Sequence, residues 1–125
     1  MDSSEVKPII KSNNDMWYMY FDGASSKEGC GAGISLYNHL GKTYLFSYRL
    51  NFPCTNNVAE FEALMLSLEN ALELGCLNII VFGDSELIIN LARKVYTPSN
   101  KLMRQYINLV TDMASKFMTF DISHV

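Results

Sequence analysis

The hydrophobic period of the chain changes at Thr55, and this change limits the folds that are open to it. Before that residue the apolar side chains come in short runs, and residues 17–21 have the aromatic and apolar composition of a central strand. After it they follow the i, i+3, i+4, i+7 spacing of one helix face until Gly75, a common stop signal. The sequence therefore predicts strands first and then one amphipathic helix over residues 55–74.

The other apolar runs extend this order. We predict a first strand that turns directly after Asp22, then a hairpin, a short strand, two further helices and a last strand. The hairpin is predicted over residues 34–37 and 43–50, and the short strand over 78–82. The two further helices are predicted over 87–91 and 100–116, and the last strand over 119–125. The order β, β, β, α, β, α, α, β is typical of a mixed α/β sheet, in which an antiparallel hairpin joins parallel strands and helices flank the sheet.

One compact domain accounts for the length of the chain. Its 125 residues are 49% hydrophobic and 18% charged, which fits a packed globule and is too apolar for intrinsic disorder. The first residues are polar and aperiodic, so we predict a flexible N-terminal lead-in over 1–15 and a single domain over 16–125. No apolar run reaches the roughly 20 residues of a membrane span, and we expect no membrane partner.

The cysteines bear on the compartment of the protein. Cys30, Cys54 and Cys76 form no CxxC pair and are odd in number. The first residues also lack the hydrophobic segment of a secretory signal. We therefore interpret the cysteines as reduced thiols of an intracellular protein of the cytoplasm or the nucleus.

The charge of the chain is unevenly distributed. The net charge of −3 argues mildly against a nucleic-acid partner, because proteins that neutralise phosphates are usually basic. Residues 87–111, however, contain no acidic residue and four basic ones: Arg93, Lys94, Lys101 and Arg104. This stretch would suit contacts to a nucleic-acid backbone, although four exposed cations are more often a solvated surface.

Three carboxylates are candidates for a metal site. Asp22 and Asp84 each follow a predicted strand, and parallel neighbouring strands would bring both to one end of the sheet. At about 100° per helical residue, Glu60 falls on the flank of its helix opposite the other glutamates, in the first turn. Such a cluster is usually relieved by divalent cations, and oxygen ligands favour Mg²⁺ or Mn²⁺. A two-metal site of this kind would hydrolyse a phosphodiester.

Each carboxylate also has a structural interpretation. Asp22 could shape a turn before Gly23, and Asp84 could cap the helix that follows it. Glu60 could be a first-turn carboxylate that is stabilised by the helix dipole. On spacing alone, the metal site and these local roles both stay open.

The stretches around the three carboxylates are more specific. They read FDGAS, GCGAGI, RLNFPCTNNVAEFEAL, ALELG and VFGDSELI. In this order they resemble the type 1 ribonuclease H domain, in the version encoded by plant gypsy-class (LTR) retrotransposons and related reverse transcriptase-like proteins. The resemblance covers residues 17–125 and implies a ribonuclease H-like five-stranded mixed sheet flanked by helices.

The resemblance also implies roles for individual residues. Asp22, Glu60 and Asp84 match three of the four carboxylates with which the family binds two Mg²⁺ or Mn²⁺ ions. The implied substrate is the RNA strand of an RNA–DNA hybrid, and the implied partner is a reverse transcriptase polymerase domain in the same polyprotein. Six residues fall where the family contacts its substrate: Gly23, Ser25, Thr55, Asn56, Asn57 and Ser85. Thr55 or an asparagine could equally cap the helix that begins there.

The chain departs from the family in two places that bear on function. The fourth carboxylate and the C-terminal helix of the family follow the last strand, whereas this sequence stops at His124 and Val125. Glu86 stands where relatives commonly have glutamine, and a carboxylate there would repel a phosphate. We expect His124 to belong to the last strand, in a structural role.

Two functions remain in competition. The first is a metal-dependent endonuclease that hydrolyses the RNA strand of a hybrid. The second is a catalytically inactive domain of the same fold that tethers a polymerase or binds nucleic acid without cutting. The three acidic residues favour the nuclease, whereas the missing fourth aspartate and Glu86 keep the tether open.

Overall fold

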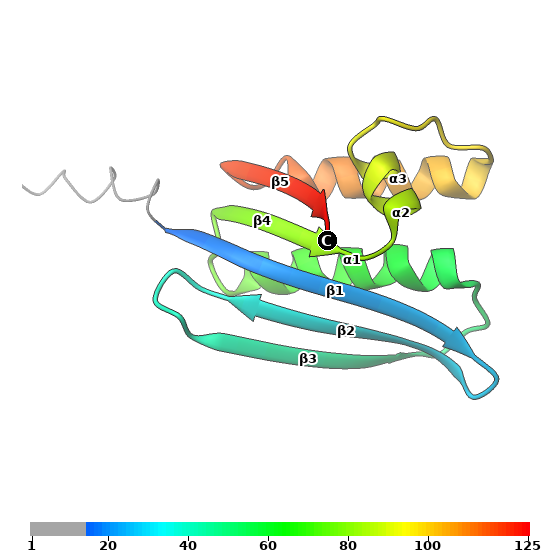
Figure 1. The fold of residues 1–125 in the computed structure, drawn as a ribbon, viewed down its shortest axis with the longest axis horizontal. Coiled ribbons are helices and arrows are strands. Elements are labelled where there is room, and N and C mark those ends of the chain that lie inside the picture. The colour runs from blue at the N-terminus through cyan, green and yellow to red at the C-terminus, as the bar shows by residue number, and fades with distance from the viewer. Residues whose placement is uncertain (1–14) are drawn as a thin grey trace, which may run out of the picture.

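The computed structural model describes residues 15–125, which form one five-stranded sheet and three helices (Figure 1). The elements are, in chain order, β1 (Met16–Ser26), β2 (Gly29–Tyr37), β3 (Thr43–Leu50), α1 (Asn56–Glu73), β4 (Asn78–Gly83), α2 (Glu86–Ala92), α3 (Lys101–Ala114) and β5 (Thr119–His124). The strand order in the sheet is β3-β2-β1-β4-β5. Strand β2 pairs antiparallel with both β1 and β3, whereas β4 pairs parallel with both β1 and β5. The predicted mixed sheet and element order are confirmed.

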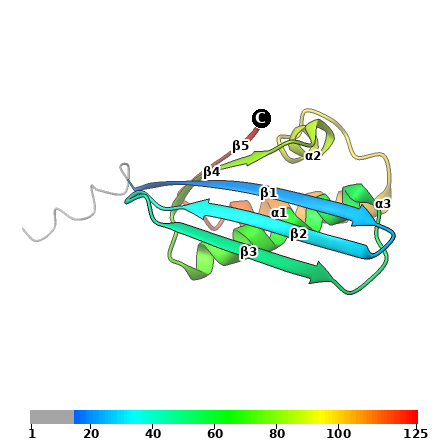
Figure 2. The same cartoon turned by 60° about the horizontal axis from the view of Figure 1, so that its bottom comes forward.

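Helices α1 and α3 lie on the same side of the sheet in both views (Figures 1 and 2). The core forms between them and the alternating side chains of the strands, such as Met19 in β1 and Val81 in β4, which are fully buried. Leu64 and Leu68 of α1 are fully buried against this face. The spacing of four between these leucines belongs to the pattern that predicted α1, whereas the strands were predicted from short apolar runs.

The opposite face of the sheet carries partly exposed aromatic side chains. Tyr18 and Tyr20 are 43% and 44% exposed. Phe82 stacks on Tyr20 with ring centroids 5.0 Å apart, and Tyr37 meets the same ring edge-on. In the described part of the chain, this face is therefore less covered than the face beneath α1.

The predicted end of the first strand is wrong. Strand β1 continues through Asp22 to Ser26, and its extension pairs with the glycine-rich start of β2, for example Asp22 with Gly33 and Ser25 with Cys30. Cys30 lies on the core face of β2, whereas Gly33 lies on the outer face. Small residues hide the strand period, which is why this segment looked like a turn and a loop.

The predicted lead-in over residues 1–15 lies outside the described residues, except for Asp15. Its carboxylate lies 3.5 Å from Nε2 of His39, near the turn between β2 and β3. The domain boundary therefore stays a prediction. Among the described helices, none has the length and apolar character needed to span a bilayer.

Candidate metal centre

Two aspartates meet where the parallel strands β1 and β4 separate. The last paired residues of these strands are Tyr20 and Phe82, and Asp22 follows two residues later in β1. Asp84 comes directly after the last residue of β4. Both carboxylates are exposed, and they lie at the end of the sheet at which ligands gather in parallel arrangements. The predicted juxtaposition of Asp22 and Asp84 is confirmed.

Helix α1 adds Glu60, whose side chain is only 7% exposed. The helix lies so close to β1 at Gly23 that an added Cβ would overlap the backbone of Ala59 and Glu60. At this contact the backbone N–H of Gly23 donates a 2.6 Å hydrogen bond to Oε1 of Glu60. The absence of a side chain at Gly23 therefore lets the carboxylate reach the end of the sheet.

One oxygen from each of Asp22, Glu60 and Asp84 lies within 4.8 Å of the other two. Burial raises the pKa of Glu60 to about 7, with further upward contributions from Asp22 and Asp84, while the Gly23 N–H bond acts in the opposite direction. Burial and the charge of Asp84 also raise the pKa of Asp22. Converging carboxylates that resist ionisation together, with oxygen as the sole donor type, fit a hard divalent cation such as Mg²⁺ or Mn²⁺.

None of the three local interpretations describes these carboxylates. Asp22 lies inside a strand rather than at a turn. The N-cap of α2 is Ser85, whose Oγ accepts from the N–H of Ile88 at 3.3 Å, so Asp84 does not cap the helix. Glu60 is the fifth residue after the N-cap Thr55, and the first turn of α1 holds no acidic residue. The prediction that Glu60 lies in the first turn is wrong, because α1 begins at Asn56 and its first turn ends before Glu60.

His124 lies in β5, as predicted. Its Nε2 lies 3.1 Å from the backbone oxygen of Asp84, and the next N–H, that of Val125, donates to the oxygen of Gly83 at 3.0 Å. The end of β5 thus supports the backbone that presents Asp84.

Most of the candidate substrate residues lie either near the end of β1 or at the start of α1. Thr55 caps α1 by accepting from the N–H of Val58 at 3.2 Å, which confirms its capping role. Asn56 accepts a 2.9 Å hydrogen bond from the backbone N–H of Ser25 through Oδ1. Asn57 and Thr55 line a pocket of about 320 Å³ between the starts of α1 and α3. Substrate contacts at these residues, at Gly23 and at Ser85 stay predictions.

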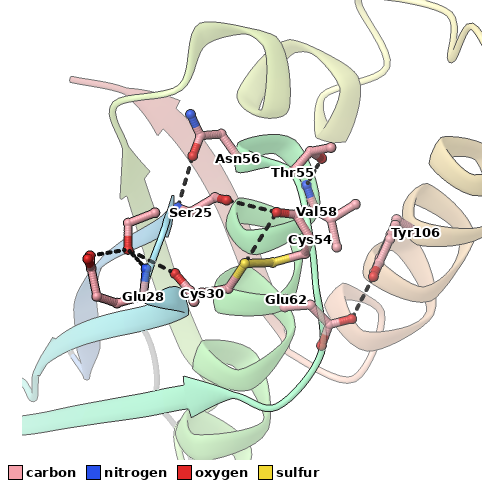
Figure 3. Close-up of a disulfide and its surroundings, with 11 residues drawn as sticks. Ser25, Glu28, Cys30, Cys54, Thr55, Asn56, Val58, Glu62 and Tyr106 are labelled. Carbon is pink, nitrogen blue, oxygen red and sulfur yellow. Dashed lines mark hydrogen bonds between the residues drawn. A yellow bond between two sulfur atoms is a disulfide. The ribbon is translucent and has the colours of Figure 1, made fainter.

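The interpretation of three reduced thiols is wrong for two of them. Cys30 of β2 and Cys54 of the loop before α1 form a disulfide, 24 residues apart in sequence, with Cα atoms 6.5 Å apart (Figure 3). Cys76 is a free, buried thiol, as predicted. The spacing of the cysteines in the sequence did not indicate this disulfide, because the loop returns to Cys30 only when β2 and β3 pair in the fold.

The four basic residues of residues 87–111 lie in the connection after α2 and in α3. Arg93, Lys94, Lys101 and Arg104 all face solvent. Lys94, the second residue after α2, adopts the left-handed conformation, with φ at 64°. Lys94 and Arg104 line the same pocket of about 350 Å³. The fold thus brings together two of the four predicted backbone contacts.

Known proteins share this architecture. Ribonuclease H1 from the halophilic archaeon Halobacterium salinarum is 26% identical with a TM-score of 0.83, over 88% of this chain and 85% of that one. The N-terminal ribonuclease H domain of a Mycobacterium tuberculosis protein is 23% identical with a TM-score of 0.80, over 89% and 82%. LC11-RNase H1, isolated from compost and solved in complex with an RNA/DNA hybrid, is 24% identical with a TM-score of 0.78, over 87% and 84%. The last two likenesses concern the fold alone.

No curated protein is significantly similar in sequence to this chain. The sequence profile of the family described as reverse transcriptase-like, in contrast, matches residues 20–125. These residues include the three clustered carboxylates and all five strands from Tyr20 of β1 onward. The chain therefore belongs to the reverse transcriptase-like family and has the ribonuclease H fold.

Proposed function

We propose that this chain is a metal-dependent endonuclease that hydrolyses the RNA strand of an RNA–DNA hybrid. The observation that carries the proposal is the cluster of Asp22, Glu60 and Asp84, whose ligand oxygens lie within 4.8 Å of one another. The fold supports it, because the similar ribonuclease LC11-RNase H1 has been solved with such a hybrid.

The three carboxylates would hold two Mg²⁺ or Mn²⁺ ions. Bound ions would supply an activated water for attack on the phosphodiester and charge stabilisation for the leaving oxygen. Within the chain, the Gly23 N–H fixes Oε1 of Glu60 and so sets the direction of its other oxygen. Asp22 and Asp84 are exposed, so a scissile phosphate can approach them from solvent.

The residues at the junction of β1 and α1 would hold the RNA strand. Asn56 is exposed and uses Oδ1 for its bond to Ser25, so its Nδ2 can donate to the substrate. Gly23, Thr55, Asn57 and Ser85 would complete this contact surface. The exposed cations Arg93, Lys94, Lys101 and Arg104 would contact the backbone of the hybrid.

The family description also suggests a biological setting. We propose that the domain works beside a reverse transcriptase polymerase domain in a retrotransposon polyprotein, in the cytoplasm or the nucleus. An inactive tether that binds nucleic acid without cutting is the second candidate. Glu86 favours it, because this exposed carboxylate directly follows Ser85 and would weaken contact with a phosphate.

The deciding experiment is cleavage of a hybrid that is end-labelled on its RNA strand, with Mg²⁺ or with Mn²⁺. The nuclease proposal expects labelled RNA fragments from the parent chain and none from Asp22→Asn. Glu69→Gln is the matched control, because this exposed carboxylate of α1 lies outside the acidic cluster. Binding without cleavage in either ion would support the tether, and cleavage that survives in Asp22→Asn would exclude this metal site.

A further inference from the structure

The loop that leads into α1 has few contacts of its own. Its residues Asn51, Phe52 and Pro53 are all exposed, and Cys54 is half-buried. Directly after it come residues 55–57, which are the candidate substrate contacts. The position of this loop therefore sets where those side chains lie.

A closed ring of contacts ties the loop to the hairpin of β1 and β2 (Figure 3). Ser25 of β1 pairs with Cys30 of β2 across the hairpin. The disulfide joins Cys30 to Cys54, and the carbonyl of Cys54 accepts a 2.8 Å hydrogen bond from Oγ of Ser25. The backbone N–H of the same serine donates to Asn56 at 2.9 Å. Cys54 and Asn56 are thus both held against Ser25.

The covalent link is the strongest member of this ring. The bond to Asn56 is exposed and the bond to Cys54 is partly buried, so water competes for both when the chain opens locally. Cys30 packs with Leu50 and Ala59 in a small buried cluster that is separate from the main core. Opening the disulfide would leave the loop with hydrogen bonds that form and break readily.

The groups that hold the metal cluster are not members of this ring. Glu60 is held by the N–H of Gly23 and by a buried part of α1, and Asp84 follows β4. Loosening of residues 51–56 should therefore disturb substrate contact more than the arrangement of the carboxylates.

We propose that the Cys30–Cys54 disulfide positions the loop for the RNA–DNA hybrid, so that the oxidised chain binds the hybrid more tightly than the reduced chain. The proposal rests on the proposed function, because it takes residues 55–57 as substrate contacts. Disulfides in a reducing compartment are usually transient or regulatory. In the cell, hybrid affinity would then follow the redox state.

The disulfide can be reached by a dithiol reductant. Both cysteines line a surface pocket of about 480 Å³ with two basic residues, Lys27 and Arg49, and one acidic residue, Glu28, so an incoming thiolate meets a net positive lining. Cys54 is the more exposed cysteine, so the thiolate attacks Cys54 Sγ and the electron pair of the S–S bond leaves on Cys30 Sγ. The second thiol of the reductant then displaces Cys54 from the mixed disulfide. The products are two protein thiols, which carry the two protons of the dithiol, and a cyclic disulfide of the reductant.

Binding and oxidation must influence each other equally. If oxidation tightens hybrid binding by some factor, bound hybrid shifts the dithiol–disulfide equilibrium toward the disulfide by the same factor. This reciprocity gives a readout that does not involve cleavage.

The test measures the affinity of a fluorescent RNA–DNA hybrid by anisotropy, with Ca²⁺ in place of Mg²⁺, for the oxidised and dithiothreitol-reduced chain. We expect reduction to weaken binding roughly five-fold or more and reoxidation to restore it. Cys54→Ser should bind like the reduced chain with or without the reductant, whereas Cys76→Ala should respond like the parent. Steady-state cleavage should show a higher KM on reduction with a smaller change in kcat, and amide exchange should quicken at Val58 but not at Gly23.

The outcomes separate the two proposals. Equal hybrid affinity of the oxidised, reduced and Cys54→Ser proteins would overturn the positioning role while leaving the nuclease proposal intact. A redox-dependent affinity without cleavage would keep the positioning role and overturn the nuclease. Absence of hybrid binding in every state would overturn both.

Discussion

The backbone N–H of Gly23 donates its hydrogen bond to the side chain of Glu60, at 2.6 Å. Strand β4 ends at Gly83, so within residues 15–125 the extension of β1 has no neighbouring strand on that side. Glu60 and Asn56 of α1 accept from Gly23 and Ser25 instead. Two residues of a strand span about 6.6 Å, and four residues of a helix rise about 6 Å. Because these lengths are similar, two side chains one helical turn apart can accept hydrogen bonds from alternate N–H groups of the strand.

Glu60→Gln should separate the two roles of this side chain. Glutamine keeps an acceptor for the N–H of Gly23 but has no charge for a cation. We expect a folded protein whose Mn²⁺ binding is greatly weakened, measured by calorimetry alongside circular dichroism. Glu60→Ala should lose the hydrogen bond as well and unfold at a lower temperature than Glu60→Gln. Equal Mn²⁺ affinity in Glu60→Gln and the parent would place the cation elsewhere.

The stability of the metal-free protein should fall as pH rises toward neutrality. The folded chain raises the pKa of Glu60 from 4.5 to about 7, so the folded state holds this proton more tightly than the unfolded state. The resulting stabilisation is complete below pH 4.5 and is lost as pH rises through about 7. Urea unfolding in EDTA at a series of pH values measures this trend. Glu60→Gln should flatten the decline between pH 5 and 8, and an unchanged slope would contradict the assignment to Glu60.

Binding of a divalent cation should release protons in the same pH range. Near pH 6 much of Glu60 is protonated in the free protein, because its pKa is about 7, and a cation displaces that proton. Calorimetric titration with Mn²⁺ in two buffers of different ionisation enthalpy counts the protons. The count should be larger at pH 6 than at pH 8.5, whereas Glu69→Gln should leave it unchanged.

Gly23→Ala should destabilise the fold at the contact between β1 and α1. The added methyl group would overlap the carbonyl of Ala59, so the helix must move away from the strand. A loss of about 3 kcal/mol in the free energy of unfolding, measured with urea, is expected from overpacking of this kind. Gly33→Ala is the control, because its added Cβ would meet nothing within 4 Å. Similar losses in both variants would mean that the close approach is not the cause.

The three cysteines should differ in reactivity. In the native oxidised chain no thiol should react with an alkylating reagent, because Cys76 is buried and burial raises the pKa of its thiol to about 12. Reduction should expose two reactive thiols, at Cys30 and Cys54, and should lower the free energy of unfolding by about 3 kcal/mol. Mass spectrometry after alkylation counts and locates them. Alkylation of Cys30 and Cys54 without a reductant would contradict the disulfide.

The sequence alone carried much of the fold because its strongest signals are local. The helical period after Thr55, the capping residue itself and the short apolar runs act over a few neighbouring residues. The motifs around Asp22, Glu60 and Asp84 likewise predicted the family and the convergence of the three carboxylates. Each of these features could be predicted before any tertiary contact was known.

Only the tertiary structure decided how far β1 continues, which atoms hold Glu60 and where Cys54 finds its partner. The extension of β1 depends on pairing with small residues of β2 that show no hydrophobic period. The Gly23–Glu60 bond joins residues 37 apart in sequence, and the disulfide joins residues 24 apart. Such contacts depend on the packing of α1 against the sheet. No local pattern of side chains shows which residues, far apart in sequence, this packing brings together.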